Sequence, residues 1–101
     1  MNVPPMSLIM NVSAPVAIMT NYPNPAFDQT TFKVRVSDYS NVSIKIYDIN
    51  GKMIAMPLNE NKDGGTFEIN VDLAEFKTGN YFATLTSNDK VVQTIKFVVS
   101  K

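Results

Sequence analysis

Residues 59–64 have the spacing that comes nearest to a metal site in this chain of 101 residues. Asn59, Asn61 and Asp63 alternate with other residues and precede a glycine, as oxygen ligands do in the first half of an EF-hand calcium loop. The twelfth position, however, is Asn70, where such a loop carries a bidentate glutamate, and no helical pattern flanks the segment. The spacing therefore favours a solvated hairpin loop, and we expect no metal and no cofactor.

Catalytic chemistry would need carboxylates, hydroxyls or lysines, because the chain has no cysteine and no histidine. That composition excludes disulfides, thiol catalysis, zinc sites of the usual kind and histidine acid–base catalysis. Asp48 has the place of a turn residue, while Glu68 and Asp72 fall on the outward face of an expected strand. No pattern buries a lysine beside a serine, as a nucleophilic dyad requires. We therefore expect that the protein is not an enzyme.

Aromatic side chains would bind sugar rings if they formed a flat outward platform. Tryptophan is absent, and the outward candidates Tyr39, Tyr47 and Phe82 are scattered along the sequence. Asn11 and Asn41 each begin an Asn-Val-Ser triplet, an acceptor pattern for glycosylation that occurs often by chance. These features give only weak support to carbohydrate chemistry.

Charge and length limit the partners and the number of domains. Nine basic and nine acidic residues are spread along the chain, so no electrostatic field attracts nucleic acid or an anionic membrane surface. No apolar run approaches the roughly 20 residues that span a bilayer. We expect no nucleic acid, no membrane span and a single domain over residues 15–101.

Residues 1–14 are expected to be a linker or an added leader in front of that domain. They contain Pro4-Pro5, which favours irregular or extended structure. No basic residue precedes Lys33, so the charged start of a signal peptide is missing. The late first basic residue suggests the tail of a larger protein behind an added Met1.

The element around which the chain is organised is a β-hairpin that turns at Asp48. Val42, Ile44 and Ile46 alternate with more polar residues, as in a strand that presents one face to a core. An aspartate at the start of a type I turn accepts backbone donors, and Gly51 suits the left-handed conformation of the bulge that follows. These residues predict a three-residue loop.

The loop length decides the strand register. A two-residue Asn-Gly loop would place Ile46 opposite Ala55 and turn large apolar residues outward, away from the core. A three-residue loop over residues 49–51 keeps the apolar residues on one side. The expected pairs are Asp48 with Lys52, Ile46 with Ile54, and Ile44 with Met56.

Other segments alternate with the same period of two, and no helical period occurs. Pro23 and Pro25 predict a stiff corner because they forbid helix and remove two ladder donors. Gly79 is expected at an unusual backbone angle, and Tyr81 behind it suggests the tyrosine corner of Greek-key sandwiches. A polar loop is expected over residues 59–65. Further strands are expected near residues 16–20, 30–37, 66–71, 81–86 and 91–100.

Short strands with turn signals every 8–12 residues predict an all-β fold, a small antiparallel immunoglobulin-like β-sandwich of about seven strands. An up-and-down barrel is the alternative. In the last strand Ile95, Phe97 and Val99 form one face, while Val92 and Val98 interrupt the polarity of the other.

Four motifs combine into a pattern: Tyr-Pro-Asn-Pro at residues 22–25, Ile-Tyr-Asp-Ile-Asn-Gly-Lys at residues 46–52, and the stretches 73–85 and 95–101. In order, spacing and position this pattern resembles the type A C-terminal sorting domain of the Bacteroidetes type IX secretion system, also called the Por secretion system. The resemblance covers residues 21–101. It implies an immunoglobulin-like sandwich at the end of an exported cargo protein that is not part of this chain.

The resemblance also implies a function and partners. Such a domain is a non-catalytic sorting signal that directs its cargo across the outer membrane by engaging the type IX translocon and an outer-membrane shuttle protein. A sorting peptidase then removes it, or it is used for cell-surface attachment. The implied location is the periplasm in transit and then the outside or the cell surface of a Gram-negative bacterium. Cleavage would fall before Tyr22, with residues 6–20 as an accessible linker.

Particular residues carry these implied roles. A last strand with valines on its second face can offer a receptor both its main-chain edge and apolar contacts, although the same valines could simply pack beneath a loop. The structural motif positions are Pro23, Asn24, Pro25, Asp48, Gly51 and Lys52. The implied recognition residues are Gly79, Tyr81, Val92, Lys96, Val98, Val99 and Lys101.

Two alternatives stay open. The chain could instead be an accessory adhesin or carbohydrate-binding β-sandwich module of a larger secreted protein. An exposed last strand could also exchange between two copies of the chain and produce a strand-exchanged dimer.

Overall fold

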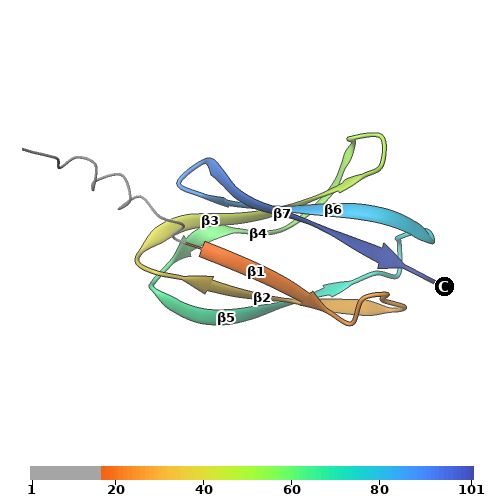
Figure 1. Ribbon diagram of the computed structural model, residues 1–101, viewed down its shortest axis with the longest axis horizontal. Helices are drawn as coiled ribbons and strands as arrows, with labels where there is room; N and C mark the ends of the chain where they lie inside the picture. Colours follow the sequence, from red (N-terminus) through yellow and green to blue (C-terminus); the bar gives the residue numbers. More distant parts are fainter. Residues whose placement is uncertain (1–16) are drawn as a thin grey trace, which may run out of the picture.

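The computed structural model describes residues 17–101, which form two antiparallel sheets packed face to face (Figure 1). The three-stranded sheet has the order β1-β2-β5 and the four-stranded sheet the order β4-β3-β6-β7. The strands are β1 (Ala17–Tyr22), β2 (Gln29–Val36), β3 (Ser40–Asp48), β4 (Met53–Lys62), β5 (Gly65–Asp72), β6 (Gly79–Ser87) and β7 (Lys90–Val99). The predicted seven-stranded sandwich is therefore confirmed, with Greek-key connections between its sheets.

Some sequence predictions fall on residues that lie before this range. The linker or leader over residues 1–14, the start of a strand at residues 15–16 and the Asn11 triplet all lie outside the described residues. The accessible linker over residues 6–20 is wrong in its last part, because Ala17 and the residues that follow it pair with β2.

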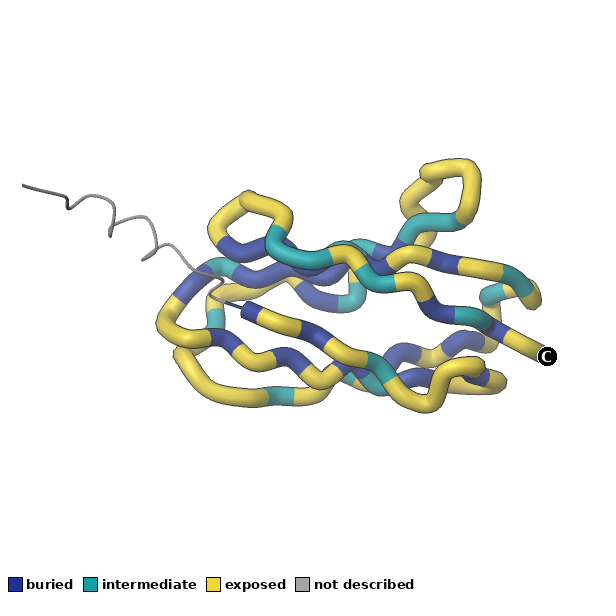
Figure 2. The backbone as a smooth tube through the Cα atoms, viewed as in Figure 1, coloured by how far each residue is buried: buried dark blue, intermediate teal, exposed yellow. Residues whose placement is uncertain are grey.

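The core lies between the sheets and takes one face of each strand (Figure 2). The alternating apolar residues of β2, β3 and β6 are buried, since side chains in a strand point to opposite faces in turn. Phe32 of one sheet meets Phe97 of the other edge to face, with ring centres 5.7 Å apart. The fully buried large side chains include Phe32, Val34, Val36, Val42, Ile44, Ile46, Leu85, Phe97 and Val99.

The turn of the β3–β4 hairpin has the predicted form. The backbone N–H of Asp48 donates to the carbonyl of Lys52 at 2.9 Å, and that of Gly51 donates to the carbonyl of Asp48 at 3.0 Å. Gly51 has a φ of 83°, the left-handed conformation that a residue without a side chain adopts at little cost. The three-residue loop over residues 49–51 is therefore confirmed.

The predicted register beyond the turn is wrong. Ile46 pairs with Ala55 and Ile44 with Leu58, because β4 carries one extra residue at each of two irregularities. Ile54 therefore lies outside the core and is 40% exposed. β4 is an edge strand, so it tolerates these bulges, and it also tolerates Pro57, which has no N–H to donate to the ladder.

The polar loop predicted over residues 59–65 is wrong as well, since β4 continues to Lys62 and β5 starts at Gly65. Only Asp63 and Gly64 connect the two strands. A side chain at Gly64 would place its Cβ 3.0 Å from the backbone oxygen of Ser37, so glycine allows this connection to pack against the β2–β3 turn.

The unusual backbone angle predicted for Gly79 is not found, because positive φ angles occur at other residues among residues 17–101. Asn88 and Asp89 have φ angles of 52° and 68°, the conformation of a two-residue type I′ turn between β6 and β7. The chain therefore reverses between the strands that were expected near residues 81–86 and 91–100.

Candidate functional site

The four motif segments meet at one end of the sandwich (Figure 1). The corner between β1 and β2, the tip of the β3–β4 hairpin, the crossover from β5 to β6 and the end of β7 all lie there. We call this the motif end. The chain enters β1 at Ala17 at the opposite end, so the two ends of the described chain are separated by the length of the sandwich.

At the motif end the β1–β2 corner binds the edge of β7. The amide side chain of Asn24 accepts a hydrogen bond from the backbone N–H of Val98 at 2.9 Å and donates one to the carbonyl of Lys96 at 3.5 Å. The N–H of Ala26 donates to the carbonyl of Val98 at 2.8 Å, and the N–H of Ser100 donates to the carbonyl of Ala26 at 2.8 Å. We call these contacts the clasp; they occupy backbone groups that an edge strand would otherwise expose.

The last residue is tied to the β5–β6 crossover. The Lys101 ammonium donates to the carbonyl of Leu73 at 2.5 Å and to that of Ala74 at 3.2 Å. The N–H of Lys101 also donates to the hydroxyl of Thr78 at 3.0 Å. Because Leu73 is fully buried, these contacts join the chain end to the core through the crossover.

Tyr81 forms the tyrosine corner that the sequence suggested. Its hydroxyl donates to the carbonyl of Lys77 at 2.6 Å, four residues earlier in the chain. Its ring packs against Phe76 and Phe97, with ring centres 5.2 and 5.7 Å away. The crossover is thus held by a buried aromatic cluster beneath the end of β7.

The hairpin tip and the crossover enclose a pocket of about 360 Å³. The Asp48 carboxylate accepts hydrogen bonds from the N–H groups of Asn50 and Lys52 at 2.8 and 3.0 Å, which orders the tip. The motif residues at the tip therefore lie opposite the motif residues of the crossover. The pocket is lined by Asp48, Lys52, Ile54, Glu75, Phe76, Lys77 and Tyr81.

The implied recognition residues divide into surface and interior positions. Lys96 and Lys101 are exposed, while Gly79, Val92 and Val98 are half-buried. The side chains of Tyr81 and Val99 are buried, so their contribution is to hold the strands in place. A receptor that reaches the motif end can contact Gly79, Lys96, Val98 and Lys101. Val92 lies near the start of β7, at the other end of the sandwich, and packs against the core.

Most of the residues considered for metal chemistry belong to β4 and the short connection that follows it. Among the residues that the structure describes, no cluster of three or more histidine, cysteine or acidic side chains could hold a metal ion. Asn59 and Asn61 lie on β4, and the amide oxygen of Asn61 accepts a hydrogen bond from Asn41 at 3.2 Å. The side chain of Asn61 thus has a structural partner across the strand pair.

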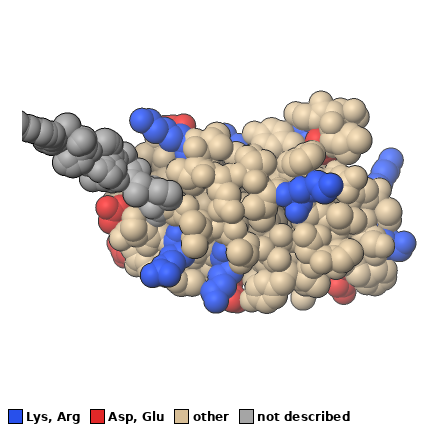
Figure 3. Space-filling model, viewed as in Figure 1, with Lys and Arg blue, Asp and Glu red and all other residues tan. Residues whose placement is uncertain are grey.

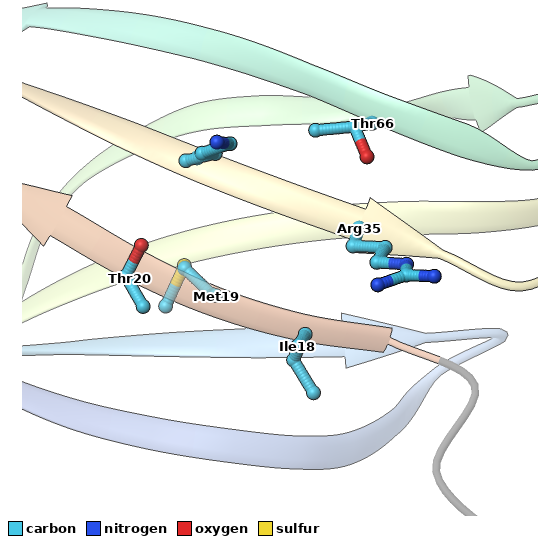
Figure 4. A pocket seen from close by; sticks show the side chains of 6 residues that line it. Ile18, Met19, Thr20, Arg35 and Thr66 are labelled. Carbon is cyan, nitrogen blue, oxygen red and sulfur yellow. The ribbon is translucent and has the colours of Figure 1, made fainter.

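The outer face of the three-stranded sheet carries an exposed tyrosine–glutamate pair. Tyr22 donates to the carboxylate of Glu68 at 2.8 Å. This hydrogen bond, followed by burial and the negative charge of Glu68, raises the pKa of the Tyr22 phenol above its ordinary value. A shallow hollow of about 500 Å³, which Ile18 and Arg35 help to line, opens on the same sheet (Figure 4).

Sequence reasoning missed two features. It treated Asn24 as part of a stiff corner and gave its side chain no partner, although an amide between two prolines was a signal for a side-chain role. It also described the outward aromatic residues as scattered, whereas Tyr47 and Phe82 are direct cross-strand neighbours on β3 and β6. Only Tyr39, in the β2–β3 turn, stands apart.

Residues 20–100 match a family model described as the secretion system C-terminal sorting domain. The crystal structure of dimeric latent PorU from Porphyromonas gingivalis is similar to this chain, with a TM-score of 0.70. The match has 24% sequence identity and covers 82% of this chain but 9% of the PorU chain, so it shows a shared fold over a small part of that protein. No curated protein matches the chain. Within residues 17–101 no helix has the length and apolar character to cross a membrane.

Proposed function

The chain belongs to the family of C-terminal sorting domains of the type IX secretion system, and we propose that it directs an attached cargo across the outer membrane. Membership implies a cargo that is secreted or displayed at the cell surface in Bacteroidetes. The cargo would pass through the periplasm before it crosses. The domain would then be cleaved off by a sorting peptidase or used for surface attachment.

The observation that best supports this proposal is the separation of the two ends of the sandwich. The motif segments lie together at the end that holds Lys101, and the chain enters at Ala17 at the other end (Figure 1). A cargo that precedes residue 17 would therefore leave the motif end free. A receptor could then bind one end of the domain while the cargo is attached at the other.

We propose that the type IX translocon and an outer-membrane shuttle protein contact side chains at the motif end. The clasp already occupies the backbone of β7 from Lys96 to Ser100, so strand addition along that part of the edge would first require its release. The receptor would therefore contact the side chains of Lys96, Val98 and Lys101. The buried side chains of Tyr81 and Val99 would hold these residues in position.

The test uses the full chain fused behind a reporter that is delivered to the periplasm of a host with this pathway. We expect the fusion to reach the outside and the reporter alone to stay in the periplasm, as measured by cell fractionation. A fusion that ends at Ser100 should be exported less, because it lacks the contacts of Lys101 with the crossover. Retention of the full-length fusion, or equal export of the reporter alone, would contradict the proposal.

A second function has one observation in its favour. Tyr47 and Phe82 are neighbours on an outer sheet face, and paired aromatic rings can stack on sugars. A glycan array would support a carbohydrate-binding module if it showed saturable binding that the double variant Y47A/F82A lost. The absence of binding would leave the sorting signal as the sole proposal.

Strand exchange between copies also stays a prediction. Exchange would require β7 to leave the clasp and the aromatic cluster at Tyr81. Light scattering on the purified chain over a range of concentrations tests it, with a dimer expected only if β7 exchanges.

A further inference from the structure

A row of four side chains crosses the outer face of the four-stranded sheet, one from each strand. Met53 of β4 pairs with Tyr47 of β3, Tyr47 pairs with Phe82 of β6, and Phe82 pairs with Lys96 of β7. Paired residues on neighbouring strands point to the same face of a sheet. Met53 is 47% and Phe82 36% exposed, so the row presents apolar and aromatic surface to solvent.

The next row on the same face adds a second positive charge. Lys45 pairs with Thr84, and the hydroxyls of Thr84 and Thr94 are hydrogen-bonded at 3.2 Å. Lys45 thus lies two residues from Tyr47 along β3, and Lys96 lies beside Phe82 on β7, so the two lysines are on different sides of the Tyr47–Phe82 pair.

No carboxylate balances these lysines on the described part of this face. Glu60 pairs with the buried residue Val42 and therefore turns to the other side of β4. The residues that point outward from β3, β6 and β7 are Asn41, Ser43, Lys45, Tyr47, Asn80, Phe82, Thr84, Thr86, Val91, Thr94, Lys96 and Val98.

The outer face of the other sheet differs in this respect. There Lys33 lies opposite Glu68 on the neighbouring strand, so the charge of Lys33 has an acidic neighbour. Glu68 also accepts a hydrogen bond from the Tyr22 hydroxyl. In the view of Figure 3 both basic and acidic side chains lie among broad uncharged areas, and the sequence has nine residues of each sign. The four-stranded face is therefore distinguished by its local chemistry and not by the charge of the whole molecule.

We propose that this face docks a protein partner that presents an apolar side chain to the Met53–Tyr47–Phe82 row and carboxylates to Lys45 and Lys96. Exposed apolar and aromatic residues are the usual anchors of protein interfaces, and charge complementarity at their rim sets the rate and selectivity of binding. The two lysines are too few for an anionic lipid surface, which typically needs a cluster of roughly 4–8 basic residues. The inference rests on the proposed export function and names a surface that the partner of the domain would use.

Two charge-reversed variants of the full-chain reporter fusion form the first test. K45E/K96E reverses the charges on the proposed face, and K33E/R35E makes the same change in net charge on the outer face of the other sheet. Melting curves establish that both variants fold. We expect K45E/K96E to slow export about tenfold or more, as loss of charge steering does. K33E/R35E should be exported at close to the parent rate. K45R/K96R keeps both positive charges and should also be exported at close to the parent rate.

Site-specific photocrosslinking forms the second test. A photoreactive phenylalanine derivative replaces Phe82 in one fusion and Ile18, on the outer face of the other sheet, in a second. We expect a discrete protein adduct from position 82 that K45E/K96E abolishes, and a much weaker adduct from position 18. Crosslinking to lipid in place of protein, or equal adducts from both positions, would overturn the inference.

The outcomes separate the two proposals. If the parent fusion is exported and K45E/K96E is exported equally fast, the docking face and the contact proposed for Lys96 are wrong, while the sorting function stands. If the parent fusion is not exported at all, the sorting function fails and the docking face fails with it.

Discussion

The side-chain amide of Asn24 bridges two backbone groups of β7, since its oxygen accepts from the N–H of Val98 at 2.9 Å and its nitrogen donates to the carbonyl of Lys96 at 3.5 Å. The residues of the first bond are separated by 74 positions in the sequence. A side chain from the first corner thus substitutes for a neighbouring strand at the edge of the last one. The corner motif and the final motif are therefore parts of one structural unit.

Replacement of Asn24 by alanine should lower the free energy of unfolding by about 0.5–1.5 kcal/mol, because the N–H of Val98 loses its acceptor. Replacement by aspartate keeps an oxygen that can accept this bond and should cost less. Urea denaturation of both variants measures the difference. Equal losses for alanine and aspartate would show that the accepted hydrogen bond is unimportant.

Replacement of Gly51 by valine should destabilise the domain by roughly 1–3 kcal/mol, since a β-branched residue is strained at a positive φ. Asparagine tolerates this conformation and provides the matched control, with a smaller loss expected. A Cβ at this position meets no atom within 4 Å, so the loss would reflect backbone strain and not a clash. Thermal unfolding measures it, and a valine variant that melts like the parent would refute the argument.

Replacement of Tyr81 by phenylalanine should cost about 1–2 kcal/mol, because it removes the hydroxyl that donates to the carbonyl of Lys77 and retains the ring. The same change at Tyr39, which is 64% exposed, is the control and should have little effect. Chemical denaturation compares the two variants. A Y81F variant as stable as Y39F would mean that the tyrosine corner contributes nothing measurable.

The Tyr22–Glu68 pair should make the stability of the fold depend on pH in the alkaline range. Because the folded pKa of Tyr22 is raised above its unfolded value, the stabilising contribution is fully present below the unfolded pKa. It is lost as the pH rises through the folded pKa. Ultraviolet absorbance titration of the wild type and E68A should show Tyr22 ionising at lower pH in the variant. Identical titration curves would exclude Glu68 as the cause of the raised pKa.

The fold class could be predicted from the sequence because strand alternation is a local property. The positions of Phe32, Val34 and Val36 two residues apart already require one buried face, whichever strands lie alongside. The turn at Asp48 and Gly51 was predictable for the same reason, since its hydrogen bonds join residues within one short segment.

The register of β4 could not be predicted, because pairing was assumed to be regular and β4 contains two irregularities. Whether an edge strand bulges depends on how its side chains pack against the core, and a linear pattern does not contain that information. Ile54 and Met56, which were expected inside, lie outside for this reason.

The sequence by itself determined which face of most strands is buried and where the chain turns, because these choices depend on residues close together in the chain. Only the tertiary structure decided that Asn24 closes the edge of β7 and that Met53, Tyr47, Phe82 and Lys96 share one row. Both features depend on which strands become neighbours and in what register, and many weak long-range contacts settle that choice together.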